Sequence, residues 1–279
     1  MLAIVLALGA SLSIGTGDFI AGAQARRTSL WGVIVVSQIT GVVWTAVVVV
    51  ARGHALPDAA VLPAIGAGLT AVGGIALGYQ ALAIGVMSII GPLISLSVAV
   101  PVVVGLLRGE RPSPLQLAGM AIALAGIVLA ARQRSAGERH EATSRLSVLL
   151  AALTALLVGV NMVCYAAAAR YDPYWGIFLA RGTSVACFAV AFAVMRPATR
   201  LTRGAIIPLV ALGVLDTGSN GLFSVASTFG YLSVVSVLSS VYPIFTLGLA
   251  HLFLHERLSR LQQIGVGAAL VGVGLIAAA

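Results

Sequence analysis

The sequence has few charged residues and contains no lysine. Only 9% of its 279 residues are charged, whereas 60% are hydrophobic. An ordinary soluble domain has roughly 25% charged residues. Apolar stretches recur along the whole chain instead of forming one anchor, which excludes an ordinary soluble fold and indicates an integral membrane protein.

The basic balance of the chain does not indicate a nucleic-acid-binding protein. The formal charge of +8 comes from sixteen arginines, and all except Arg181 fall between the apolar stretches. No soluble domain is present to carry a basic face.

The two cysteines, Cys164 and Cys187, lie in apolar stretches, where a thiol usually behaves as a small buried hydrophobe. A disulfide or a catalytic cysteine is therefore not predicted.

The sequence also lacks a convincing enzyme, cofactor or metal motif. His251 and His255 lie four apart beside Glu256 and could share a helix face as metal ligands, but a histidine pair at a helix end near the membrane interface is the favoured interpretation. The GTG of residues 15–17 resembles part of a dinucleotide loop. Such a loop needs a preceding strand and a soluble sheet, so these glycines are predicted to pack helices. We predict no cofactor, no metal and no enzymatic activity.

Ten apolar stretches are long enough to cross a membrane as helices, because about 20 residues span ~30 Å. The predicted spans are Leu2–Ala23, Leu30–Ala51, Val61–Ile84, Ile89–Leu107, Pro114–Ala131, Leu146–Ala169, Trp175–Met195, Ile206–Phe229, Val234–Leu254 and Leu261–Ala278. The first span could be a signal peptide, but it lacks a basic start and is longer than a usual signal sequence. We predict an all-α integral membrane fold.

The chain contains an internal repeat with an offset of 144–146 residues. Pairs of matching positions include Trp31 and Trp175, Gly68 and Gly213, Glu110 and Glu256, and Gly119 and Gly265. We predict a first five-helix repeat over residues 1–131, a charged linker over 132–145 and a second repeat over 146–279. An odd number of spans makes the second half enter the membrane from the opposite side, so the two repeats are predicted to be inverted.

The end of each repeat carries the same features. The first copy, from Pro101, reads PVVVGLLRGERPSPLQLAGMAIALAGIVLA, and the second, from Pro243, reads PIFTLGLAHLFLHERLSRLQQIGVGAALVGVGLI. The chain resembles the EamA family of the drug/metabolite transporter superfamily at these residues. Its opening GTGDFIAGAQARR is similar to one bacterial subgroup of that family. The resemblance implies a secondary transporter in a bacterial inner membrane, with a small organic substrate.

One departure from the family pattern concerns the proline of the first repeat. Pro243 lies thirteen residues before Glu256, whereas Pro101 lies nine before Glu110. The difference is about one helical turn. Since proline interrupts a helix, we expect the kink of the first repeat to lie nearer the loop.

Three charged residues fall well within predicted spans: Asp18, Arg181 and Asp216. Each costs roughly 2.5–3.5 kcal/mol at a helix centre, so each is expected to face the interior of the bundle and to find a partner. Asp216 is the deepest acid, and Arg181 is predicted to reach toward it. Asp18 is shallower and is the weaker candidate for coupling. The alternative is that these charges form structural ion pairs only.

Other polar side chains complete the predicted pocket. Asp216 and Asn220 lie four apart and so share a helix face. The remaining candidates for substrate or coupling contacts are Asn161, Tyr165, Tyr79, Gln80 and Tyr242. By contrast, Gly119/Ala123/Gly126 and Gly265/Ala269/Gly272 are small-residue stripes. We predict that they pack against each other or against a second protomer.

The favoured function is a secondary transporter that moves a small organic metabolite, amino acid or drug-like compound by alternating access. The predicted partners are that substrate, the lipid bilayer and, through Asp216, protons; the chain is predicted to be a monomer or homodimer. A non-transporting membrane scaffold is the alternative.

Eleven arginines lie on one side of the membrane and four on the side of the termini. Charge bias therefore predicts external termini, whereas the resemblance implies cytoplasmic ones.

Overall fold

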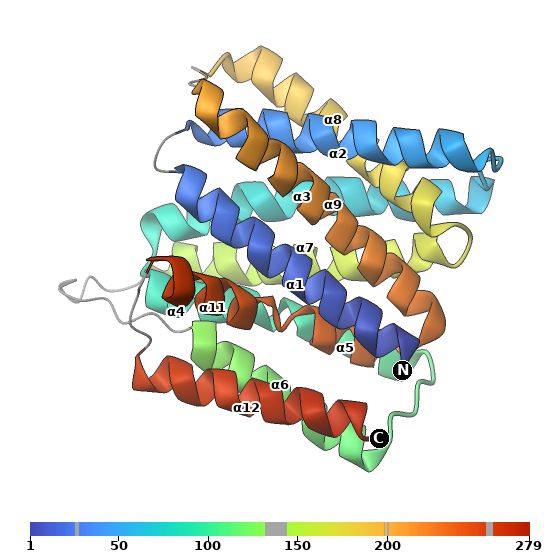
Figure 1. Cartoon of the computed structure of the whole chain (residues 1–279), viewed down its shortest axis with the longest axis vertical. Helices are drawn as coiled ribbons and strands as arrows, with labels where there is room; N and C mark the ends of the chain where they lie inside the picture. Colours follow the sequence, from blue (N-terminus) through green and yellow to red (C-terminus); the bar gives the residue numbers. More distant parts are fainter. Residues whose placement is uncertain (26–27, 132–143, 198, 200, 255–258) are drawn as a thin grey trace.

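The computed structural model (Figure 1) describes the chain except residues 26–27, 132–143, 198, 200 and 255–258. The described part is helical and contains no strand. Its main helices are α1 (Leu2–Ala25), α2 (Leu30–Arg52), α3 (Asp58–Ile84), α4 (Met87–Ser95), α5 (Ala99–Leu107), α6 (Pro114–Ala131), α7 (Arg145–Ala169), α8 (Pro173–Met195), α9 (Ile206–Phe229), α10 (Leu232–Ser239), α11 (Tyr242–Leu254) and α12 (Arg260–Ala277). Ten spans among these residues are long and apolar enough to cross a membrane. The predicted membrane fold is therefore confirmed.

Two of the ten spans are interrupted, at matching places in the repeat. The span of α4 and α5 is broken by a 3₁₀ turn, η1 (Leu96–Val98), and the span of α10 and α11 is broken at Ser240–Val241. The breaks are about 144 residues apart. Pro101 lies inside α5, after η1, so the first break does not coincide with this proline. The expected displacement of the first kink toward the loop stays a prediction. The break follows the repeat, and the proline does not set its place.

The two halves interleave. In the described structure α1 packs on α9, and α7, the first helix of the second half, packs on α3. α6 and α12 pair at the edge of the bundle (Figure 1). The N and C labels lie at the same end of the helices in Figure 1, as ten crossings require. Each half is thereby built into the other, and neither half forms a separate layer.

The glycines that allow close helix approach occur in matched pairs. A Cβ atom at Gly68 would lie 2.6 Å from the Ala180 carbonyl oxygen, and one at Gly213 would lie 2.6 Å from the Ser37 carbonyl oxygen. Gly213 follows Gly68 by 145 residues, and Ala180 follows Ser37 by 143. The same close crossing is thus made twice, as two inverted copies would make it. The inverted relationship of the halves stays a prediction that these contacts support.

The small-residue stripes of α6 and α12 face each other. A Cβ at Gly119 would lie 2.8 Å from the Gly272 carbonyl oxygen, and one at Gly265 would lie 2.8 Å from the Gly126 carbonyl oxygen. Backbone therefore meets backbone along this crossing, where only glycine fits. Of the two alternatives for these stripes, the structure selects packing within the chain.

The glutamate of the first Glu-Arg pair caps a helix of the other half. The Glu110 carboxylate accepts bonds from the Leu232 N–H at 2.6 Å, the Ser233 N–H at 3.0 Å and the Ser233 hydroxyl at 2.6 Å. These N–H groups open α10 and have no partner inside the helix. Glu110 therefore joins the α5–α6 connection to the buried half-helix α10. The corresponding Glu256 lies outside the described residues, as do Arg257 and His255.

Candidate substrate site

The charges predicted in the membrane interior meet between α8 and α9. Arg181 Nη2 lies 2.7 Å from Asp216 Oδ2, and Arg181 Nη1 donates a bond to Gln38 Oε1 of α2 at 3.2 Å. The Arg181 side chain is 7% exposed, whereas that of Asp216 is 48% exposed. The guanidinium is therefore embedded among helices, while part of the carboxylate faces accessible space.

Glycines on the neighbouring helices make room for this pair. The crossing of α9 over α2 at Gly213 brings Asp216 close to α2. A Cβ at Gly41 would meet the Thr217 hydroxyl oxygen and would lie 3.6 Å from Arg181 Cδ. A side chain at position 41 would therefore collide with Thr217 of α9, whereas its distance from Arg181 Cδ is an ordinary van der Waals contact.

Asp18 joins the same cluster from α1. Its side chain is exposed, yet it interacts electrostatically with Asp216 of α9, Tyr79 of α3 and Tyr242 of α11. An acid surrounded by three other helices faces an inward space and not lipid. The sequence placed Asp18 as the shallower and weaker candidate, whereas the structure brings it to the other charges.

Tyr165 lies behind the ion pair. Tyr165 belongs to α7, its side chain is buried, and it interacts electrostatically with both Arg181 and Asp216. Asp18 and Asp216 supply two carboxylates to the cluster, and Arg181 supplies one guanidinium. Among the described residues, Asp18 makes no ion pair. If both acids are ionised, the cluster carries a formal charge of −1.

Two predicted pocket residues serve mainly to hold helices. Asn161 Nδ2 of α7 donates to the Ala67 carbonyl oxygen of α3 at 2.6 Å and lies 3.4 Å from Thr70 Oγ1. Asn220 Nδ2 donates to the Asp216 carbonyl oxygen at 2.9 Å, so it shares the predicted helix face but bonds to the backbone. Such bonds stabilise helix contacts and local backbone.

Gln80 remains apart from the cluster. It is exposed on α3, and no contact in the described structure joins it to the charges. The roles of all nine predicted residues in substrate binding remain predictions. The structure pairs Arg181 with Asp216. Four more of the predicted residues interact electrostatically with this pair or with one another: Asp18, Tyr79, Tyr165 and Tyr242.

Sequence reasoning missed Gln38, which bonds the buried guanidinium. The signal was present, because Gln38 precedes Arg181 by 143 residues, close to the repeat offset. Equivalent positions near the axis of an inverted repeat approach each other. A polar residue at the repeat equivalent of a buried charge is therefore a candidate partner.

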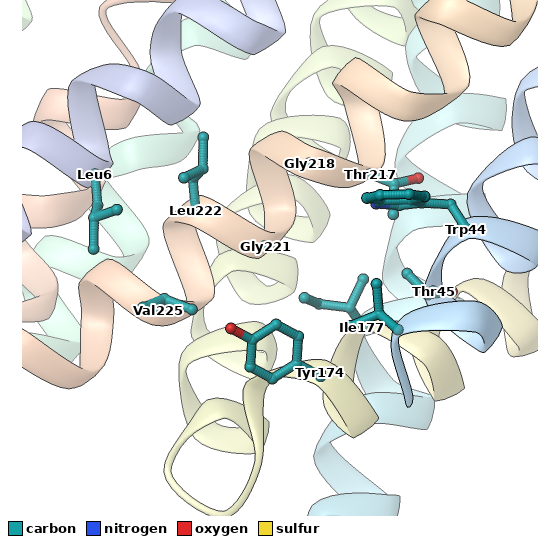
Figure 2. A pocket seen from close by; sticks show the side chains of 11 residues that line it. Leu6, Trp44, Thr45, Tyr174, Ile177, Thr217, Gly218, Gly221, Leu222 and Val225 are labelled. Carbon is teal, nitrogen blue, oxygen red and sulfur yellow. The ribbon is translucent and has the colours of Figure 1, made fainter. Parts of the chain in front are cut away.

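A cavity of about 380 Å³ lies between α1, α2, α8 and α9 (Figure 2). Its walls include Leu6, Trp44, Ile177 and Val225, and it contains few polar atoms. The lining also includes Thr217, which follows Asp216. On a helical wheel Gly218 lies on the side of α9 away from Asp216, whereas Thr217 lies between these two sides.

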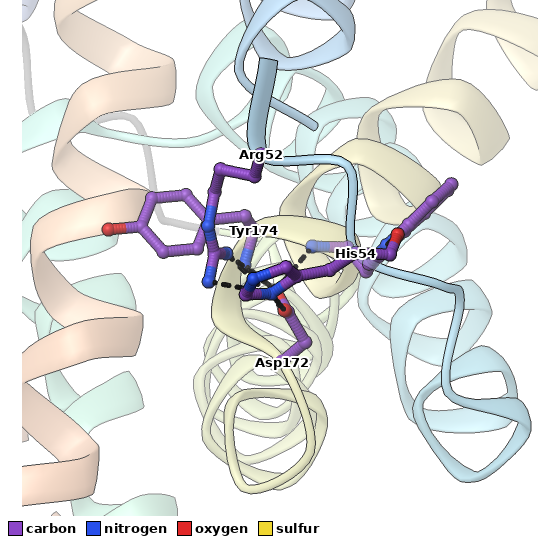
Figure 3. A network of polar contacts seen from close by, with 5 residues as sticks. Arg52, His54, Asp172 and Tyr174 are labelled. Atoms are coloured by element: carbon purple, nitrogen blue, oxygen red, sulfur yellow. Dashed lines mark hydrogen bonds and ion pairs between the residues drawn. The ribbon is translucent and has the colours of Figure 1, made fainter. Parts of the chain in front are cut away.

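A third feature is a polar network at one end of the helices (Figure 3). Asp172 caps α8 by accepting from the Tyr174 and Trp175 N–H groups at 2.8 and 3.0 Å. Arg52 Nη1 lies 3.3 Å from each Asp172 oxygen, and its guanidinium stacks 4.0 Å from the centre of the Tyr174 ring. The network ties the end of α2 to the start of α8.

No arrangement in the described chain suggests a metal site, since no group of three His, Cys, Asp or Glu side chains gathers there.

Comparison with known proteins gives a family and a fold. Residues 145–278 match the sequence model of the EamA-like transporter family, which confirms the resemblance over the second half. A protein of known crystal structure aligns with a TM-score of 0.82 over 98% of this chain and 95% of its own, at 20% identity. This likeness concerns the fold alone. No curated protein matches the chain significantly.

Proposed function

We propose that this multi-pass membrane protein, whose residues 145–278 belong to the EamA-like transporter family, is a secondary transporter. It moves a small organic metabolite, amino acid or drug-like compound by alternating access. The proposal places it in a bacterial inner membrane, as a monomer or homodimer, and assigns it no enzymatic reaction. The repeats over 1–131 and 146–279 supply the two parts that move against each other.

The observation that carries the proposal is the open charged cluster within the membrane spans. Burying charges in a membrane costs free energy, and ionisable groups there commonly mark substrate or ion pathways. A scaffold would need its charges only as closed pairs. Here Asp216 is half exposed although it is paired with Arg181, and Asp18 has no ion-pair partner among the described residues. This arrangement favours binding and release over a purely structural role.

The interrupted spans suggest how the cluster changes during transport. Tyr242, which interacts with Asp18, is the first residue of α11 and directly follows the break at Ser240–Val241. A change of angle at this break alters the distance between Tyr242 and α1. Such motion around a fixed midplane site is typical of transporters with discontinuous helices. The acids Asp18 and Asp216 are the groups through which protons would couple to the substrate.

The test is flux in proteoliposomes that contain the purified protein, with substrates first selected by a thermal-shift screen of metabolites, because a ligand stabilises the state it binds. Asp18→Asn and Asp216→Asn keep nearly the same side-chain volume while removing the charge. Both variants are expected to fold and to lose flux or its dependence on a proton gradient. Asp58→Asn, at the exposed start of α3, is the matched control. Unchanged flux in both cluster variants would leave the scaffold function as the better explanation.

Orientation in the membrane requires a separate measurement. More arginines lie on the side of the α8–α9 connection than on the side of the termini, which indicates that the side of this connection is cytoplasmic. In a background with Cys164 and Cys187 replaced by Ala, Thr199→Cys would then resist an impermeant maleimide in intact cells, while Ala55→Cys would react. The opposite pattern would support the orientation implied by the family, with both termini inside.

A further inference from the structure

Asp18, the acid of the charged cluster that has no ion pair among the described residues, faces the interior of the bundle. A Cβ atom at Gly15 would lie 2.7 Å from Phe245 Cβ of α11, and one at Gly17 would lie 3.3 Å from Leu212 Cδ1 of α9. On a helical wheel Asp18 lies on the shorter arc between Gly15 and Gly17. This side of α1 is therefore turned toward α9 and α11 and away from lipid.

The space around the Asp18 carboxylate is open. Asp18 is exposed, and it interacts electrostatically with the phenol groups of Tyr79 and Tyr242. No hydrogen bond of the described structure joins the carboxylate to either phenol. A Cβ at Gly22, one turn further along the same side of α1, would meet no described atom within 4 Å. The carboxylate and the phenols thus leave room for a ligand group that donates hydrogen bonds.

The charges around this space select a cation. Asp216 is held by Arg181, whose side chain is 7% exposed and also bonds Gln38. All other Asp, Glu and Arg residues of the described chain lie at the ends of the spans or between them. Within the described spans, the Asp18 carboxylate therefore lacks a cationic partner. Like charges repel strongly where the dielectric constant is low, so a negative ligand would be repelled by Asp18, whereas a cation would neutralise it.

We propose that the substrate of this site is an organic cation with a single positive charge, a protonated primary amine whose ammonium group binds the Asp18 carboxylate. An ammonium group has three N–H donors, and the phenolic oxygens of Tyr79 and Tyr242 supply acceptors beside the carboxylate. The inference rests on the proposed function, because it takes the charged cluster as the substrate site. It selects amines over amino acids, since Arg181 is occupied by Asp216 and leaves the carboxylate of an amino acid without a cation.

Four compounds with one phenyl ring separate the charge of a ligand from its size. At neutral pH phenethylamine is a cation, 2-phenylethanol is uncharged, phenylalanine is a zwitterion and 3-phenylpropionate is an anion. Equilibrium dialysis measures their binding to the purified protein in nanodiscs of phosphatidylcholine, a zwitterionic lipid that does not concentrate cations. Phenethylamine is expected to bind saturably. The other three should bind at least about ten-fold more weakly, the effect of losing a charge-assisted hydrogen bond or of adding a repelled carboxylate.

Two variants test the groups that hold the ammonium. Asp18→Asn keeps the side-chain volume and should weaken phenethylamine binding at least about ten-fold, whereas Asp58→Asn, at the exposed start of α3, should not change it. Tyr79→Phe removes one phenolic oxygen and should weaken binding about five-fold. Its control is Tyr171→Phe, at a phenol that is 56% exposed between α7 and α8. The comparison of the four compounds uses the parent protein, so it holds even if a variant does not fold.

Other outcomes overturn the proposal. If phenethylamine did not bind saturably, or if phenylalanine or 3-phenylpropionate bound as tightly, the site would not select an amine. Phenethylamine binding that is unchanged in a folded Asp18→Asn variant would exclude Asp18 as its anchor, and unchanged binding in Tyr79→Phe would contradict the part given to that phenol.

A failure of the transport function gives a different result. Phenethylamine that binds through Asp18 without flux in proteoliposomes would support the cation site and contradict transport. Flux of an uncharged or anionic compound, with no binding of phenethylamine, would support transport and overturn the assignment of a cation.

Discussion

α9 and α3 occupy equivalent places in the two halves but differ on two of their faces. Both helices cross a neighbour closely through a glycine, Gly213 in α9 and Gly68 in α3. On the inner face, Asp216 of α9 corresponds to Ala71 of α3. On the outer face, the space beside Gly218 is open, whereas Leu157 fills the equivalent space beside Gly73.

This difference separates what the duplicated scaffold requires from what is free to change. The close glycine crossings occur in both halves, because a side chain there would collide with backbone. Among the described residues, the charge of Asp216 is not repeated at Ala71, and the open space beside Gly218 is not repeated beside Gly73. Asymmetry of this kind gives a two-fold scaffold one charged cluster and one apolar cavity.

The largest effect is expected at the duplicated crossings. Gly213→Leu and Gly68→Leu each place a side chain within 2.6 Å of a backbone carbonyl oxygen already at its Cβ, and backbone on both helices must shift. Each variant should lose about 3 kcal/mol of stability and give little monodisperse protein in size-exclusion chromatography. Gly218→Leu, on the same helix as Gly213, should remain monodisperse. Equal behaviour of all three variants would contradict the division between scaffold and variable faces.

The next largest effect is expected from making the halves alike at the ion pair. Asp216→Ala copies Ala71 and leaves Arg181 embedded without its carboxylate. The cost should be about 2 kcal/mol, below the 3–5 kcal/mol of a fully buried pair because Asp216 is half exposed. Arg181→Gln, which copies Gln38, should restore most of this stability in the double variant, since no unpaired charge remains.

Thermal unfolding of the two single variants and the double variant, read as a double-mutant cycle, measures this coupling. The double variant should fold but lose flux. Additive losses of stability would show that the two charges do not depend on each other. Retained flux in the double variant would remove the pair from the transport site.

The fold was largely predictable from the sequence, whereas the site was predictable only in part. The ten apolar stretches locate the membrane spans, and the repeat offset shows which spans of the two halves correspond. Both can be read directly from the order of residue types. The approach of Arg181 to Asp216 was predictable from their depth. The position of Asp18 near Tyr242 was not, because it depends on how α1 and α11 cross, which their own periodicity does not specify. The burial of the Thr217 hydroxyl, which has no hydrogen-bond partner among the described residues, likewise depends on packing.

A smaller effect is expected at the cap that joins the halves. Glu110→Gln removes the charge and one of two acceptor oxygens that hold the start of α10. The loss should be about 1 kcal/mol, typical of a helix cap, and should lower the thermal midpoint by a few degrees. Arg111→Gln, the exposed neighbour, controls for a general effect of charge. A midpoint equal to that of the parent would mean that water caps α10 equally well.

The smallest effect is expected where the two halves cap equivalent helices with different residues. Ser29 caps α2 by accepting from the Gly32 N–H at 3.2 Å, and Asp172 caps α8 and also pairs with Arg52. Asp172→Ser therefore converts the second cap into the first. The hydroxyl keeps the helix cap and loses only the ion pair. Because Arg52 is 31% exposed, that pair should contribute about 0.5 kcal/mol.

Asp172→Ala removes both functions of the side chain and should cost about 1 kcal/mol more than Asp172→Ser. Salt separates the two contributions, because screening weakens the ion pair and leaves the cap nearly unchanged. The difference between the parent and Asp172→Ser should therefore shrink when thermal unfolding is repeated in 1 M salt, while the difference between the Ser and Ala variants persists. If the Ser variant were as unstable as the Ala variant at both salt concentrations, the carboxylate itself would be required for the cap. The caps of α2 and α8 would then not be interchangeable, and the two halves would differ at the helix ends as well as inside the membrane.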